Sequence, residues 1–152
     1  MQRLTISIFL LIFSLVLCAS AKDETVDQMK ARFEKARAED RPELGIKIAE
    51  LQLHNADKLY NDGKIEEARA ALDDIVTYSE KARDAAIQTR KRLKNAEIDT
   101  RKMADKLRDI KRNLAFEDHP PVEEAIDRLE AVRTTLLDEM FAKDNKNKKD
   151  KK

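Results

Sequence analysis

Cysteine is almost absent from the sequence, because Cys18 is the only one among 152 residues. It lies in an N-terminal apolar segment that we expect to be removed on export, so the mature chain would contain none. This excludes a disulfide framework, a thiolate metal site and a cysteine nucleophile from the mature protein.

Glycine is also scarce, with only Gly45 and Gly63 in the whole chain. A phosphate-cradling loop needs several closely spaced glycines, so this kind of nucleotide site is excluded. Ser79 is the only serine of the expected mature chain, and neither a glycine elbow nor an adjacent base accompanies it. We therefore expect no catalytic residue, no cofactor and no enzymatic activity.

Aromatic residues make up 5% of the chain and tryptophan is missing, whereas charged residues make up 40%. Few bulky side chains are thus available for a thick globular core. The abundant Ala, Glu, Lys, Leu and Arg are typical of long amphipathic helices and coiled coils. The composition predicts an all-α protein with a thin core shared between neighbouring helices.

The N-terminus has the three parts of a secretion signal. Arg3 supplies positive charge, residues 4–17 are apolar, and Ala19-Ser20-Ala21 supplies the small residues required for processing. We expect residues 1–21 to be a signal peptide and the protein to be periplasmic or extracellular, with a bacterial envelope as the favoured location. The alternatives are a retained N-terminal anchor and a lipoprotein at Cys18, although Leu17 is bulky for the latter. No transmembrane segment is expected in the mature chain, because the apolar run is shorter than the roughly 20 residues that span a bilayer.

Four helical segments are predicted, over residues 25–39, 42–62, 64–114 and 122–142. Pro42 fits the first turn of the second helix, and Gly63 fits the left-handed position that ends it. Pro120 and Pro121 end the third helix and begin the fourth.

The third predicted helix has neither proline nor glycine and carries an apolar or small residue at alternating spacings of three and four. This 3.5-residue repeat predicts a single coiled-coil helix of about 50 residues, roughly 75 Å long. The fold expected for residues 22–142 is an elongated antiparallel helical bundle or coiled coil of about four helices around that long helix. The repeat consists of Ile65, Ala68, Leu72, Ile75, Ser79, Ala82, Ala86, Thr89, Leu93, Ala96, Thr100, Met103, Leu107, Ile110 and Leu114.

The middle of this repeat is its weakest part, because most of its residues are small or polar and bury little apolar area. The flanking helices are also too short to cover the full length of a 75 Å rod. We therefore predict that the middle is exposed and is the interaction seam for a second copy or a partner helix. The candidate seam residues are Ser79, Ala82, Ala86, Thr89, Leu93, Ala96 and Thr100.

Charge predicts how the last two helices pair. Residues 90–112 have a net charge of +6 and residues 117–139 a net charge of −6, so the fourth helix is expected to fold back on the third. Apolar burial drives such packing and charge selects its alignment, since exposed ion pairs contribute only about 0.2–1 kcal/mol each. By the same reasoning, the second helix is expected to pack on the first half of the third.

Residues 143–152 contain six lysines and two aspartates, and we predict that they form a disordered tail. Such a tail either binds an anionic surface or only increases solubility. The basic run that begins at Arg90 could bind a polyanion, but its charge could also be offset by the fourth helix. The candidate anion-binding residues are Arg90, Lys91, Arg92, Lys94, Lys146, Lys148, Lys149, Lys151 and Lys152.

Residues 52–72 resemble a single helical hairpin of the tetratricopeptide type. Ala56, Leu59, Gly63, Ala68 and Leu72 have spacings similar to the packing residues of that family, and the sequence from Gly63 to Ala68 looks like its turn. Gln52 and Asn55 depart from the pattern, because a large aromatic residue and a leucine are usual there. No second copy follows at a 34-residue period.

The two histidines do not indicate a metal site. His54 has Glu50 four residues before it and Asp57 three residues after it, which is a weak arrangement of possible ligands, and His119 lies in a polar turn. We interpret both as solvated surface residues and expect no bound metal.

The sequence thus favours a non-catalytic exported helical protein that binds a protein partner or itself, as a structural or accessory module of the cell envelope. The alternative is a binding protein for an anionic envelope component such as lipid head groups or peptidoglycan. Specific nucleic-acid binding is not expected, because the basic residues are balanced by acidic ones.

Overall fold

In a computed structural model, the described residues 24–149 form five α-helices and one short 3-10 helix, with no strand among them. The helices are α2 (Val26–Lys35), α3 (Arg41–Asn61), α4 (Ile65–Thr89), α5 (Leu93–Arg112) and α6 (His119–Lys149), with η1 (Phe116–Asp118) before α6. The predicted signal peptide lies outside the described residues. The all-α helical bundle predicted from the sequence is confirmed.

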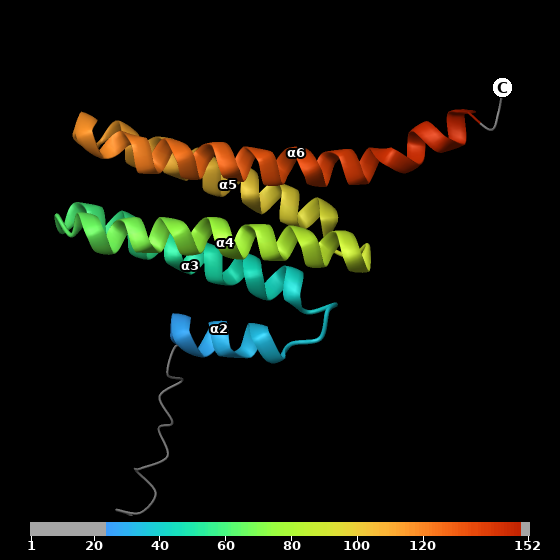
Figure 1. The fold of residues 1–152 in the computed structure, drawn as a ribbon, viewed down its shortest axis with the longest axis horizontal. Helices are drawn as coiled ribbons and strands as arrows, with labels where there is room; N and C mark the ends of the chain where they lie inside the picture. Colours follow the sequence, from blue (N-terminus) through green and yellow to red (C-terminus); the bar gives the residue numbers. More distant parts are fainter. Residues whose placement is uncertain (1–23, 150–152) are drawn as a thin grey trace, which may run out of the picture.

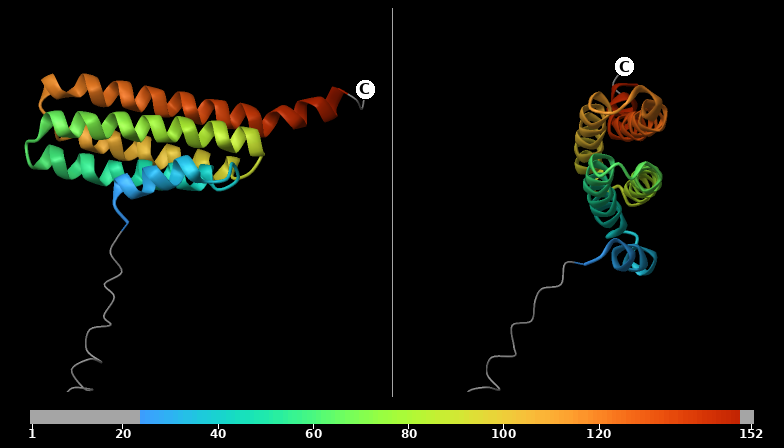
Figure 2. Two further views of the ribbon diagram at one scale, coloured as in Figure 1. Left: turned by 60° about the horizontal axis from the view of Figure 1, so that its bottom comes forward. Right: turned by 90° about the vertical axis from the view of Figure 1, so that its left-hand side faces the viewer.

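The helices run alternately up and down and form two layers (Figures 1 and 2). One layer contains α2, α4 and α6, and the other contains α3 and α5. The hairpins α3–α4 and α5–α6 are the most closely packed pairs, and they stack side by side because α4 contacts α6 and α3 contacts α5. Both predicted pairings, of the second helix with the first half of the third and of the fourth with its second half, are confirmed.

The predicted 50-residue helix is wrong, because the chain reverses direction between α4 and α5. Arg90 and Arg92 adopt left-handed conformations, with φ values of 57° and 62°. The hydroxyl of Thr89 accepts a hydrogen bond from the backbone N–H of Lys91 and donates one to the carbonyl of Ala85. The helix breaks here although the segment contains neither proline nor glycine, the residues that usually end a helix.

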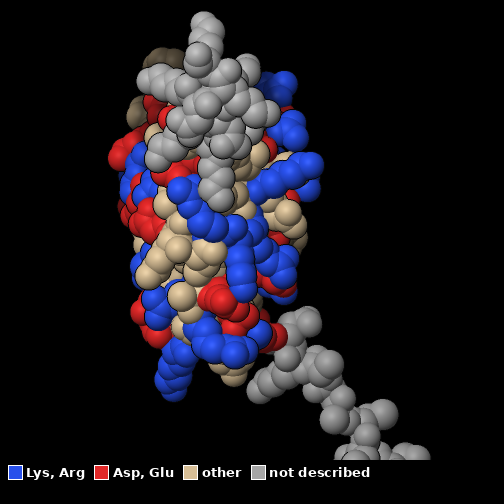
Figure 3. Space-filling view, turned by 90° about the vertical axis from the view of Figure 1, so that its right-hand side faces the viewer, with Lys and Arg blue, Asp and Glu red and all other residues tan. Residues whose placement is uncertain are grey.

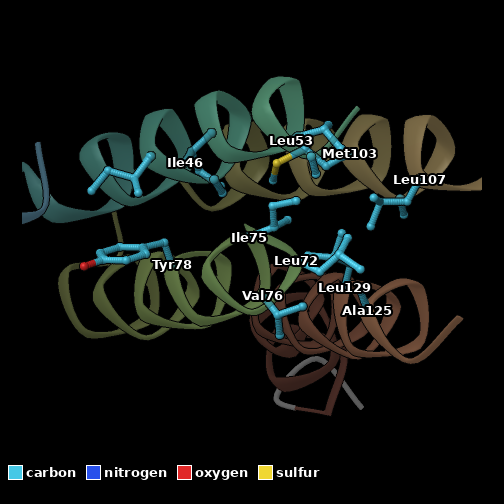
Figure 4. Packing of buried hydrophobic residues seen from close by; sticks show 14 of the residues in the cluster. Ile46, Leu53, Leu72, Ile75, Val76, Tyr78, Met103, Leu107, Ala125 and Leu129 are labelled. Atoms are coloured by element: carbon cyan, nitrogen blue, oxygen red, sulfur yellow. The ribbon is translucent and has the colours of Figure 1, made fainter. Parts of the chain in front are cut away.

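Apolar burial explains why the chain accepts this turn. A non-glycine residue in the left-handed region costs about 1–2 kcal/mol. Reversal brings Met103, Leu107 and Ile110 of α5 into the common core, where each is at most 3% exposed. Full burial of a side chain of this size contributes about 1.5–3 kcal/mol, so three of them outweigh two strained residues. Figure 4 shows side chains from α3, α4, α5 and α6 meeting in this cluster.

The ends of the other helices follow local chemistry. Pro42 lies in the first turn of α3, Gly63 has φ 72° at the end of the first hairpin, and the paired prolines lie in the first turn of α6, as predicted. The first helix is shorter than predicted and ends at Lys35, where Ala36 adopts an extended conformation. The Arg41 guanidinium donates to the carbonyls of Ala36 and Glu34.

The C-terminal end also differs from the prediction. We expected disorder from residue 143 onward, but α6 continues to Lys149. Lys151 and Lys152 lie outside the described residues.

Candidate functional site

The predicted interaction seam is internal to the bundle, so the expectation that it is exposed is wrong. Ser79, Ala82, Ala86 and Thr100 have exposed fractions of 0%, and Ala96 of 2%, while Thr89 and Leu93 at the α4–α5 turn are half-buried. The seam is covered because the chain folds at its centre and packs the two halves of the repeat against neighbouring helices. The periodicity correctly identified the buried face but not the partner, which is the chain itself.

The basic run at the α4–α5 turn is matched by acidic residues from other elements. Arg90 pairs with Glu139 of α6 at 2.6 Å, and Lys91 pairs with Glu39 at 2.9 Å. These contacts connect the turn to α6 and to the loop between α2 and α3, while the neighbouring Lys94 is exposed. The ion pair with Lys91 lowers the pKa of Glu39. An anion binding here would have to compete with carboxylates already in place.

The structure nevertheless brings the α4–α5 turn and the helical backbone of Lys146, Lys148 and Lys149 to the same end of the bundle. The α4–α5 turn and the C-terminal part of α6 both lie at the right-hand end of Figure 1. Lys and Arg side chains gather on this end in Figure 3. The backbone of Lys146, Lys148 and Lys149 belongs to α6, but the placement of their side chains is not described.

A groove that the sequence did not predict lies between α3 and α5, with a volume of about 210 Å³. Its lining combines apolar and small residues with charges of both signs, and it includes one predicted seam residue and one predicted anion-binding residue. The lining residues are Pro42, Glu43, Ile46, Lys47, Glu50, Arg92, Asn95, Ala96 and Asp99. Only the reversal after α4 places α5 beside α3, so the sequence pattern contained no signal for this groove.

Two glutamates of the groove, Glu43 and Glu50, differ in their charged surroundings. Glu43 receives ion pairs from Arg92 at 2.6 Å and Lys47 at 2.8 Å, and Lys47 and then Arg92 lower its pKa. Glu50 is different, because partial desolvation at the rim and then the nearby charge of Asp99 raise its pKa. The groove thus places Glu50 near a second carboxylate, Asp99, which is itself paired with Lys102 at 3.1 Å.

Replacing Glu50 by glutamine is expected to stabilise the protein slightly at pH 7. A folded-state pKa above the unfolded value means that Glu50 favours folding at low pH, and that this contribution is lost as the pH rises through the folded pKa. The gain from Glu50→Gln should be below about 1 kcal/mol, because the side chain is exposed to solvent. Urea unfolding at pH 7 should show the gain, and it should vanish below the ordinary glutamate value of 4.5.

Glu130→Gln is the matched control, with the opposite sign. Hydrogen bonds from Arg108 and then Arg133 lower the pKa of Glu130, so its contribution is present above the unfolded pKa and is lost as the pH falls through the folded pKa. This variant should be destabilised at pH 7 and approach the wild type in acid. A loss of stability in Glu50→Gln at pH 7 would contradict the interpretation that the ionised form of Glu50 is unfavourable in the folded protein.

The histidines do not converge on a ligand set. His54 is exposed on α3, and the imidazole Nε2 of His119 lies 3.2 Å from the carbonyl of Leu114. Within residues 24–149, no three potential ligands among His, Cys, Asp and Glu lie close enough to hold a metal ion. None of the helices in this part of the chain is long and apolar enough to cross a membrane.

No family model, no curated protein and no solved structure matches this chain. The turn at Gly63 has a geometry that any antiparallel helical hairpin can adopt, so the resemblance of residues 52–72 to the tetratricopeptide type stays a prediction.

Proposed function

We propose that the protein is a non-catalytic interaction module of the cell envelope that binds a protein partner in the groove between α3 and α5. The observation that carries this proposal is the groove itself, which combines an apolar floor with a rim of both charges. Ile46 and Ala96 line the groove and are at most 7% exposed. Specific interfaces combine such a floor with polar groups that fix the orientation of the ligand.

The stacked hairpins support this proposal because they hold the groove in a fixed shape. α3 is packed against α4, and α5 against α6, so each wall of the groove belongs to a separate helical pair. The ion pair between Arg92 and Glu43 joins the two walls at one end. A preformed groove loses little conformational entropy when a ligand binds, which favours affinity.

Photo-crosslinking in the cell envelope tests the proposal. A photo-reactive residue at Asn95, on the groove rim, is expected to give a discrete adduct with a partner protein. The same group at Asp127, exposed on α6, is the matched control and should give none. Adducts of equal yield at both positions, or none at position 95, would contradict the groove as the binding site.

A second candidate function is binding of an anionic envelope component. The observation that favours it is that the α4–α5 turn and the C-terminal end of the α6 backbone lie at the same end of the bundle (Figure 1). Because Arg90, Lys91 and Arg92 are paired with carboxylates, the lysines of residues 143–152 would supply most of the attraction. Each lysine near an anionic surface contributes about 1 kcal/mol.

A further inference from the structure

The C-terminal part of α6 extends beyond the other helices (Figures 1 and 2). Phe141 is 54% exposed, one of two large hydrophobic side chains in the described residues with this degree of exposure. Leu137 lies one helical turn before Phe141 and Met140 immediately before it, and both are half-buried. Glu139 of α6 pairs with Arg90 at 2.6 Å, two residues before Phe141.

Positive charge follows this apolar residue at once. The ten residues after Ala142 contain six lysines and two aspartates, a net charge of +4. The end of the bundle from which α6 extends also displays Lys and Arg side chains (Figure 3). Lys94, near the start of α5, is exposed. An exposed aromatic residue next to a basic cluster is the combination that favours the interface of an anionic bilayer.

We propose that this end of the protein binds an anionic phospholipid bilayer, with Phe141 and Met140 entering the interface and the lysines of residues 143–152 contacting the head groups. This inference rests on the second candidate function and assigns its ligand. A soluble polyanion would match the lysines but would leave Phe141 in water, whereas a bilayer accommodates both. An inserted apolar side chain and a cluster of lysines each attach a protein to a membrane only weakly, but together they give stable attachment.

A second copy of the chain is a poorer occupant for the same apolar surface. A symmetric contact through Phe141 would bring two lysine-rich segments together, each with a net charge of +4. Like charges at an interface oppose association, and the opposition is strongest at low ionic strength. An anionic surface turns the same charge into an attraction.

Vesicle co-sedimentation tests the proposal with the chain that begins at Lys22, which contains the whole described fold and lacks the N-terminal apolar run. The wild type should bind vesicles of phosphatidylglycerol and phosphatidylcholine but not vesicles of phosphatidylcholine alone. Phe141→Ser should weaken this binding at least about tenfold, because it removes most of the apolar area that enters the interface. Phe116→Ser is the matched control, since Phe116 is 84% exposed at the opposite end of the bundle and should have no effect.

Binding to dextran sulfate separates this inference from the function on which it rests. Removal of residues 143–152 should abolish binding to dextran sulfate and to anionic vesicles, whereas Phe141→Ser should leave dextran sulfate binding unchanged. Equal vesicle binding by Phe141→Ser and the wild type would overturn the bilayer assignment while anion binding survives. If the wild type binds neither probe, anion binding is overturned as well. If the wild type is a dimer and Phe141→Ser is a monomer, the surface belongs to a second copy of the chain.

Discussion

Replacement of Leu107 by glutamate is expected to leave the protein unfolded at 25 °C. Leu107 is fully buried between α5 and its neighbours, in the cluster shown in Figure 4. The substitution removes the apolar contribution of the leucine and places an unpaired carboxylate in the core, which costs several kcal/mol. Because single domains are stable by only about 5–15 kcal/mol, the two effects together are expected to exceed the stability of this domain. Circular dichroism at 222 nm measures the loss of helix.

Leu93→Glu is the matched control for this experiment. Leu93 is a member of the same heptad stripe but lies half-buried at the first position of α5, where a glutamate can reach water. A carboxylate in the first turn of a helix is also favoured by the helix dipole. We expect this variant to retain its helicity and to lose at most about 2 kcal/mol. Equal loss of structure in both variants would mean that the α4–α5 turn is as tightly packed as the core.

The contrast between these two leucines shows what a periodic pattern predicts. The 3.5-residue repeat correctly identified many of the buried positions of α4 and α5 between Ala68 and Ile110, but it missed Val76, Tyr78 and Ala104, which are at most 6% exposed. It could not predict that the helix breaks, because the periodicity of buried residues continues through the turn even though the chain reverses. The break depends on two arginines in left-handed conformations. Arginine rarely adopts this conformation, and no local sequence motif predicts it here.

Charge patterning was informative about helix pairing and less so about binding. The opposite net charges of the two C-terminal segments correctly predicted their antiparallel packing, and the pairs Arg108–Glu130 and Lys111–Glu123 link them at 2.7 and 2.8 Å. The same charges made the run after Thr89 resemble a polyanion site. Its partners Glu39 and Glu43 lie about 50 residues earlier, so only the tertiary fold brings them within reach.

The groove between α3 and α5 could not be predicted for the same reason. Its walls are separated by more than 40 residues in sequence, and their proximity follows from the reversal after α4. The surface of α6 near Phe141 was closer to prediction, since its apolar residues and the lysines after them are visible in the sequence. What the fold added is that α6 extends past its neighbours and leaves this surface exposed.

Gly45→Ala is expected to destabilise the protein by about 2 kcal/mol, although alanine is the better helix former. In the interior of α3 the change should stabilise by about 0.5–1 kcal/mol through helix propensity alone. A Cβ at this position, however, would lie 2.8 Å from the carbonyl oxygen of Tyr78 and 2.9 Å from the Cβ of Ala82. Both atoms are fixed by the backbone of α4, so the two helices must separate, and overpacking of this kind costs about 1–3 kcal/mol or more.

The close approach of α3 and α4 at Gly45 also involves α2, because the ring of Phe33 lies 3.3 Å from the same Cβ position and packs edge-on against Tyr78. Gly45→Ala should therefore loosen α2 first, which hydrogen exchange of residues 26–35 would detect before global unfolding. Gly63→Ala is the control, since nothing lies within 4 Å of its added Cβ and only its φ of 72° is strained. That variant should lose about 1 kcal/mol with unchanged exchange in α2. An increase in stability for Gly45→Ala would show that α3 and α4 can separate without loss of packing, and the tight contact assigned to Gly45 would then be wrong.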